Sequence, residues 1–107
     1  MRVSRDEFLF DDFQQALTWV IADEIRTGLV QARLPEALVS ALTKHLVGRI
    51  AAVLDGRKPL NAEGQSAFPN VAFLLSPEEL LIAGGPAWLS QHVAGTVEAL
   101  LQEKANR

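Results

Sequence analysis

The apolar positions of residues 5–32 predict a helix that is apolar on more than one side. At about 100° per residue, these positions fall along three lines that point in different directions. The lines are Leu9, Phe13, Ala16, Leu17 and Val20; Ile21, Ile25, Leu29 and Ala32; and Phe8, Trp19 and Val30. A helix that is apolar on several sides has to be buried on several sides. Because a chain of 107 residues offers few elements to bury it, we expect a second subunit to cover part of this helix.

A second helix is predicted over residues 36–54, antiparallel to the first. Ser4 and Glu7 have the spacing of a capping box at the start of the first helix. Pro35 favours the start of a new helix, and we expect Gly56 to be the left-handed cap at the end of that helix. A joint this short predicts an antiparallel helical hairpin. The inward stripe expected on the second helix is Leu38, Val39, Leu42, Leu46, Ile50 and Val53.

Residues 55–70 contain two glycines and two prolines and predict one long irregular loop. Loops of this length in compact domains often carry function. Leu60 and Phe68 are expected to attach the loop to the core.

Two structures remain open for residues 71–83. Ser76-Pro77-Glu78-Glu79 has the pattern of a helix start, and we favour a helix on that basis. The flanking apolar runs could instead pair as a short β-hairpin across these four residues. After the break at residues 84–86, a C-terminal helix is predicted over 87–104. The chain is thus predicted to be all-α, or mainly helical, and a single domain over 1–107.

The absence of cysteine excludes disulfides, thiol nucleophiles and zinc-thiolate sites. The N-terminus turns acidic at Asp6 and Glu7, where a signal peptide would turn apolar. No uninterrupted apolar run approaches the about 20 residues that span a bilayer. These features favour a soluble, cytoplasmic protein without membrane attachment.

Charge is distributed unevenly along the chain. The net charge of −3 argues against nucleic acid as the main partner. Residues 1–25 carry two arginines against six carboxylates, whereas residues 26–58 carry six basic side chains against two acidic ones. The simplest interpretation is an antiparallel pair of helices with complementary flanks. The alternative is a basic patch that binds an acidic partner.

Glu24, His45 and Arg49 form the one polar cluster that the predicted hairpin brings together. Glu24 follows an apolar line of the first helix, and Arg49 falls within the stripe of the second. A buried charge has to be paired. We therefore expect a partly buried ion pair that fixes the helix register, with a ligand or proton-transfer site as the alternative.

Catalytic and metal-binding patterns are not evident. His45 and His92 lack the close spacing of zinc ligands, and the adjacent carboxylates in Asp11-Asp12 and Asp23-Glu24 diverge around a helix. No serine lies in a nucleophile motif. We therefore predict neither a catalytic residue nor a cofactor or metal ion.

The sequence favours a small non-enzymatic protein–protein interaction module, in the form of a homodimer. Phe8, Trp19 and Val30 are the expected contact line, since aromatic side chains often dominate interfaces. One alternative is a small-ligand-binding protein or minor enzyme with its polar site between the first two helices. Another is an acidic regulator of a nucleic-acid-binding protein.

Overall fold

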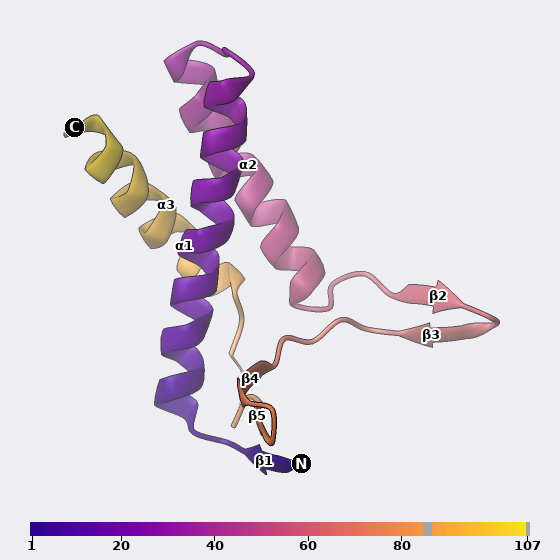
Figure 1. Cartoon of the computed structure of the whole chain (residues 1–107). Coiled ribbons are helices and arrows are strands. Elements are labelled where there is room, and N and C mark those ends of the chain that lie inside the picture. Colours follow the sequence, from indigo (N-terminus) through magenta and orange to yellow (C-terminus); the bar gives the residue numbers. More distant parts are fainter. Residues whose placement is uncertain (85–86, 107) are drawn as a thin grey trace.

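Three helices account for most of the part of the chain that the structure, a computed structural model, describes: residues 1–84 and 87–106. The antiparallel hairpin predicted from the sequence is confirmed, and it consists of α1 (Glu7–Gln31) and α2 (Glu36–Leu54). The C-terminal helix α3 (Ser90–Ala105) packs against both (Figure 1). The protein is helix-dominated, with 58% of residues helical, and adds a small number of strands.

The helix ends follow from local side chains. Asp6 is the N-cap of α1, and its carboxylate accepts a hydrogen bond of 3.1 Å from the amide of Leu9. The expected capping box is therefore wrong, because Ser4 lies in a strand instead. Pro35 precedes α2 and offers no side-chain cap. Its fixed φ of −58° nevertheless suits a helix start.

Small side chains form much of the contact between the helices. The core cluster is Ala22, Val47, Val97 and Leu100, with Trp19, Ile25, Val93 and Leu101 packed around it. Two buried threonines satisfy their own hydroxyls within their helix. Thr18 donates to the carbonyl of Gln14 at 2.8 Å, and Thr43 donates to that of Val39 at 2.6 Å. Such internal bonds let a polar residue enter a helix interface without an external partner.

The buried side of α2 differs from the predicted stripe. Its buried residues are Val39, Thr43, Val47 and Ala51. Of the predicted set only Val39 is buried, and Leu38, Ile50 and Val53 are exposed. The larger side chains of α2 thus lie beside the core and not in it.

Residues 71–83 form a β-hairpin, so the favoured helix is wrong and the alternative is confirmed. The hairpin consists of β4 (Phe73–Ser76) and β5 (Glu79–Leu81), which pair antiparallel. A third strand, β1 (Arg2–Ser4), pairs parallel with β5 and gives the strand order β1-β5-β4. The N-terminus supplies this strand from a segment that the sequence placed before a helix.

Phe73 attaches this sheet to α1. Its ring centroid lies 5.3 Å from that of Phe10 in an edge contact and 5.3 Å from that of Phe13 in a stacked one. The turn of the hairpin uses Ser76, whose hydroxyl accepts from the amide of Glu78 at 3.2 Å. The helix-start pattern is thus realised as a serine turn.

The segment after α2, expected as an irregular loop, contains a second hairpin that projects from the helices (Figure 1). It consists of β2 (Leu60–Ala62) and β3 (Gln65–Ala67), which pair with each other. We call residues 57–68 the arm. The sequence predicts that Leu60 and Phe68 attach this segment to the core. That prediction is wrong, because the two side chains are 55% and 65% exposed.

Replacing Gly56 by alanine is expected to destabilise the root of the arm by about 1–2 kcal/mol. Gly56 has φ +84°, and a Cβ added there would lie 2.7 Å from the carbonyl oxygen of Pro69. Gly64 is the matched control, because it has φ +77° but open space around it. Urea denaturation of both variants should show a larger decrease in the free energy of unfolding for Gly56→Ala than for Gly64→Ala. Equal losses would mean that the close approach to Pro69 is not maintained.

Candidate functional site

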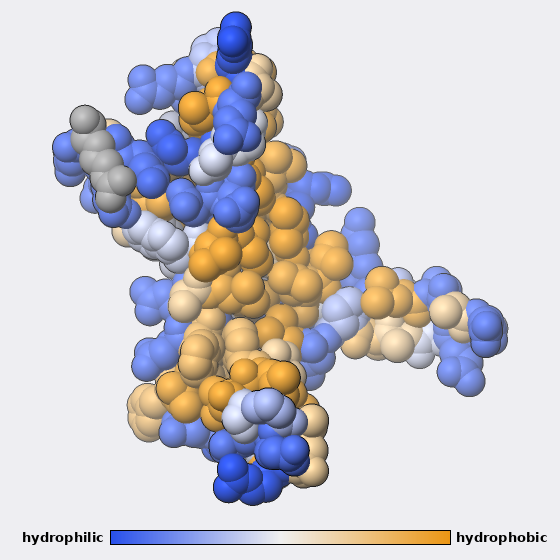
Figure 2. Space-filling model, in the orientation of Figure 1, coloured by the Kyte–Doolittle hydropathy of each residue, from blue (hydrophilic) through white to orange (hydrophobic). Residues whose placement is uncertain are grey.

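Large apolar side chains remain uncovered on α1, α2 and β4. They are Leu9, Phe13 and Val20 along one side of α1, with Phe8 and Val30 elsewhere on that helix; Leu38, Ile50 and Val53 on α2; and Leu74 and Leu75 on β4. Leu9, Phe13 and Val20 recur at intervals of four and seven residues and therefore share one side of the helix. Figure 2 shows an almost continuous apolar area over α1 and α2 that extends down to the small sheet. We call Leu9, Phe13, Val20, Leu38, Ile50 and Val53 the apolar surface.

The protein is more extended than a compact monomer of its size. Its Cα radius of gyration is 15.8 Å, whereas about 13 Å is typical of a 107-residue domain. Its accessible surface is 7318 Å², against about 5,900 Å² expected for a monomer of 11.7 kDa. The difference, about 1,400 Å², is surface that a compact monomer would have buried.

The predicted contact line of Phe8, Trp19 and Val30 is interrupted at Trp19. Phe8 is 86% exposed and Val30 is 46% exposed. Trp19 is half-buried and packs against the core cluster of its own chain. Phe8 and Val30 are therefore available for contact with another molecule, whereas Trp19 packs within its own chain.

Glu24, His45 and Arg49 do not form the buried cluster predicted from the sequence. All three are exposed, and none has a hydrogen bond or ion pair within residues 1–84 and 87–106. Glu24 follows Val20 by one helical turn and therefore borders the apolar surface. Arg49 borders it on α2, where it lines a shallow hollow of about 200 Å³ with Val53.

That hollow gathers positive charge at the C-terminal end of α2. Besides Arg49, its lining includes Arg57 and Lys58 at the start of the arm, above an apolar floor of Ala52 and Val53. None of the three cations has an ion pair within the described part of the chain. The site is therefore an apolar surface with an uncompensated basic end.

Carboxylates of α1 pair with α3 and not with α2. Asp11 Oδ1 lies 2.7 Å from His92 Nε2, and Asp23 Oδ1 lies 3.6 Å from Lys104 Nζ. Among the described residues no ion pair joins α1 to α2. The expected pairing of complementary flanks in the hairpin is therefore wrong, and the basic charge of α2 is available to another molecule.

Asp55 joins the end of α2 to the start of α3, and no pattern in the sequence singles it out. It ends α2, and its carboxylate accepts from the amides of Leu89 at 2.7 Å and Ser90 at 2.9 Å, and from the Ser90 hydroxyl. These bonds fix the start of α3 to the end of α2. The partners are 34 and 35 residues away along the chain, so no local spacing reveals the contact.

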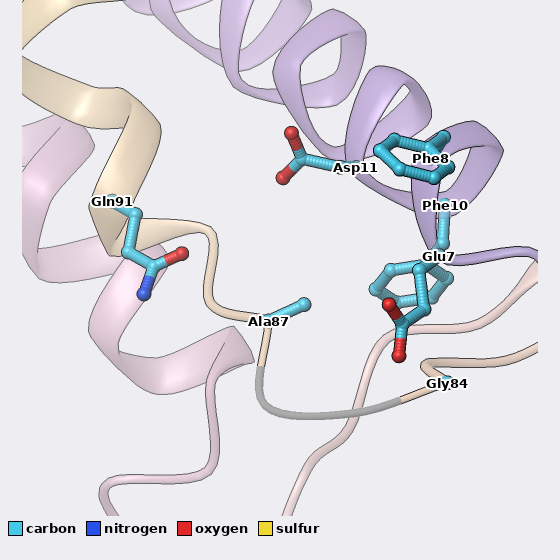
Figure 3. A pocket seen from close by; sticks show the side chains of 7 residues that line it. All are labelled: Glu7, Phe8, Phe10, Asp11, Gly84, Ala87 and Gln91. Atoms are coloured by element: carbon cyan, nitrogen blue, oxygen red, sulfur yellow. The ribbon is translucent and has the colours of Figure 1, made fainter.

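A hollow of about 300 Å³ lies where α1 begins, beside α3 (Figure 3). Figure 3 shows Asp11 of α1 and Gln91 of α3 on opposite sides, with Ala87 between them. Its described lining also includes Glu7, Phe8, Phe10 and Gly84, and it holds no hydroxyl, thiol or imidazole. The Asp11 carboxylate already pairs with His92. This hollow offers carboxylates and apolar walls, but no nucleophile and base in contact.

Within the described residues, no group of three or more histidine or carboxylate side chains could hold a metal ion. One helix, Glu36–Leu54, is long and apolar enough by length and composition alone to cross a membrane. Only 22% of that window is buried within the chain. Most of this apolar helix is therefore available for contact with another molecule.

Comparison with known proteins supplies no family for this arrangement. No protein-family model matches the chain, and no curated protein or solved structure matches it either.

Proposed function

We propose that this protein is a non-enzymatic interaction module that forms a homodimer through the apolar surface of α1 and α2. The observation that carries the proposal is the surface excess of about 1,400 Å² over a compact monomer. Obligate homodimers remove about 1,000 Å² or more from each subunit. One additional copy would therefore bring the exposed area to that of an ordinary globular protein.

The packing within the protomer also supports this proposal. Thr18, Thr43 and Ala51 are buried, whereas Val20 and Ile50 are exposed. A monomer would be expected to bury its larger apolar side chains first. The arrangement is typical of a subunit in which the large side chains serve a second interface.

Charge supports a second copy as the occupant of this surface. Asp12 and Glu24 of α1 are exposed without an ion pair in the described chain, and so are Arg49, Arg57 and Lys58. In a two-fold dimer the same patch of both subunits is used twice, so that each acidic helix can oppose the basic helix of its partner. α1 of one copy would then lie against α2 of the other, and both sets of charges would be compensated at the rim.

The alternative functions have less support. A ligand site or minor enzyme would need Glu24, His45 and Arg49 to converge, and all three are exposed. An acidic regulator would present its carboxylates to a basic partner, whereas two of the acidic side chains of α1, Asp11 and Asp23, already pair with His92 and Lys104 of α3.

Light scattering after gel filtration at micromolar concentration tests the proposal. We expect a mass of twice 11.7 kDa and partial dissociation on dilution. A mass of 11.7 kDa up to the solubility limit would contradict the proposal. A monomer that sediments with phosphatidylcholine–phosphatidylserine vesicles would also contradict it, and would assign the apolar surface to a lipid bilayer.

A further inference from the structure

The arm is a formed element that contacts little of its own chain. Every residue from 57 to 68 is exposed. Among the described elements, β2 and β3 make substantial contacts only with each other. An isolated two-stranded hairpin is marginally stable in water. The arm therefore lacks, within the protomer, the supporting surface that such a hairpin usually needs.

The two sides of the arm differ in character. Leu60 pairs with Ala67 and Ala62 with Gln65, so that these residues share one side. On the other side Asn61 pairs with Ser66, and the Ser66 hydroxyl donates to Asn61 Oδ1 at 2.5 Å. The arm is thus moderately amphipathic, with a leucine and two alanines beside Gln65 on one side, and that side faces solvent in the protomer. An amphipathic strand pair is typical of an element with one covered side.

The root of the arm fixes the direction in which it projects. The Arg57 amide donates to the carbonyl of Ala52 at 3.1 Å, which ties the first residue of the arm to α2. Opposite, Gly56 approaches the backbone of Pro69 so closely that a Cβ would not fit. The two chain ends of the arm are therefore held together, and the hairpin leaves α2 as a preformed unit.

We propose that the arm of each copy packs its apolar side on α1 of the other copy, so that the two protomers clasp each other. This inference rests on the proposed homodimer and names the element that closes it. In the two-fold arrangement argued above, α2 of one copy lies against α1 of its partner. Because the arm continues directly from α2, this arrangement would bring it beside the partner's α1, where Leu9, Phe13 and Val20 are exposed.

A matched pair of aspartate substitutions tests the clasp in the full-length chain. Leu60→Asp places a charge on the apolar side of the arm, and Asn61→Asp places the same charge on the polar side. Asn61→Asp also keeps the oxygen that accepts from Ser66. We expect Leu60→Asp to raise the dimer Kd by at least about tenfold, and Asn61→Asp to change it by less than about twofold, in sedimentation equilibrium.

The outcomes separate this inference from the proposed function. A wild-type dimer whose Kd is unchanged by Leu60→Asp would overturn the clasp and leave the homodimer intact. A wild-type monomer would overturn both. Circular dichroism of each variant at equal concentration checks that the helices remain folded.

A photo-cross-linking residue at position 67 locates the arm directly. Equal amounts of ¹⁴N-labelled and ¹⁵N-labelled chains are mixed, irradiated and digested. We expect cross-linked peptides of mixed label that join the arm to residues 7–31. Cross-links confined to one label, or joined to α3 alone, would overturn the proposal.

Discussion

Replacing Val20 by aspartate is expected to convert the homodimer into a folded monomer. Val20 is 56% exposed in the protomer and lies on the same side of α1 as Phe13. In the dimer its replacement would bury a carboxylate without a partner, which costs several kcal/mol. Because the interface is two-fold, each dimer carries the change twice. We expect Kd to rise at least about 100-fold, equivalent to about 2.7 kcal/mol, in sedimentation velocity over a dilution series.

Gln15→Asp is the matched control for this change. Gln15 is exposed on α1, five residues before Val20, and points to a different side of the helix. The control should keep the wild-type Kd. A Val20→Asp protein that dimerises like wild type would show that α1 is not in the interface. Trp19 is a poorer choice for this test, since it packs against the core cluster and its loss would damage the fold.

The helices could be predicted from the sequence because their signals are local. Pro35, the apolar pattern and Gly56 predict a helix over residues 36–54, and the structure has the same bounds. The last helix is predicted over 87–104, and the structure has it at Ser90–Ala105. Periodicity and end signals depend on residues a few positions apart, so that a single sequence contains them.

The rotation of α2 could not be predicted, because two neighbouring stripes compete for the core. One stripe holds Leu42 and Leu46, and the other holds Thr43 and Val47. Hydropathy favours the first, yet Thr43 and Val47 are buried. The hydroxyl of Thr43 is satisfied within its own helix, and small side chains allow the helices to approach closely. The same error of rotation placed Arg49 inward when it lies on the surface.

The strands could not be predicted with certainty because their partners are distant in sequence. Leu80 of β5 pairs with Val3 of the N-terminal strand, and Phe73 packs against Phe10 and Phe13 of α1. Such contacts stabilise a hairpin relative to a competing helix, and the local sequence pattern does not reveal them. The arm was missed for a related reason, since glycines and prolines that suggest an irregular loop also form its turn and its root.

Replacing Asp55 by alanine is expected to give the largest loss of stability among the single substitutions considered. The Asp55 carboxylate bonds the amides of Leu89 and Ser90 and the Ser90 hydroxyl. A carboxylate at the end of α2 is disfavoured by the helix dipole by about 0.3–1 kcal/mol. Capping of a helix start and hydrogen bonds to a charged group contribute more, and we expect a net loss of about 2–3 kcal/mol.

Thermal unfolding at fixed protein concentration measures this loss, because dimerisation makes Tm depend on concentration. The expected decrease in Tm is about 8–12 °C, at about 4 °C per kcal/mol. Ser90→Ala removes one of the three bonds and should cost about 1 kcal/mol. Asp55→Asn keeps one carbonyl acceptor, so its decrease in Tm should lie between those of Ser90→Ala and Asp55→Ala. A change of less than about 2 °C for Asp55→Ala would mean that the start of α3 is held by the buried side chain of Leu89 and not by the carboxylate.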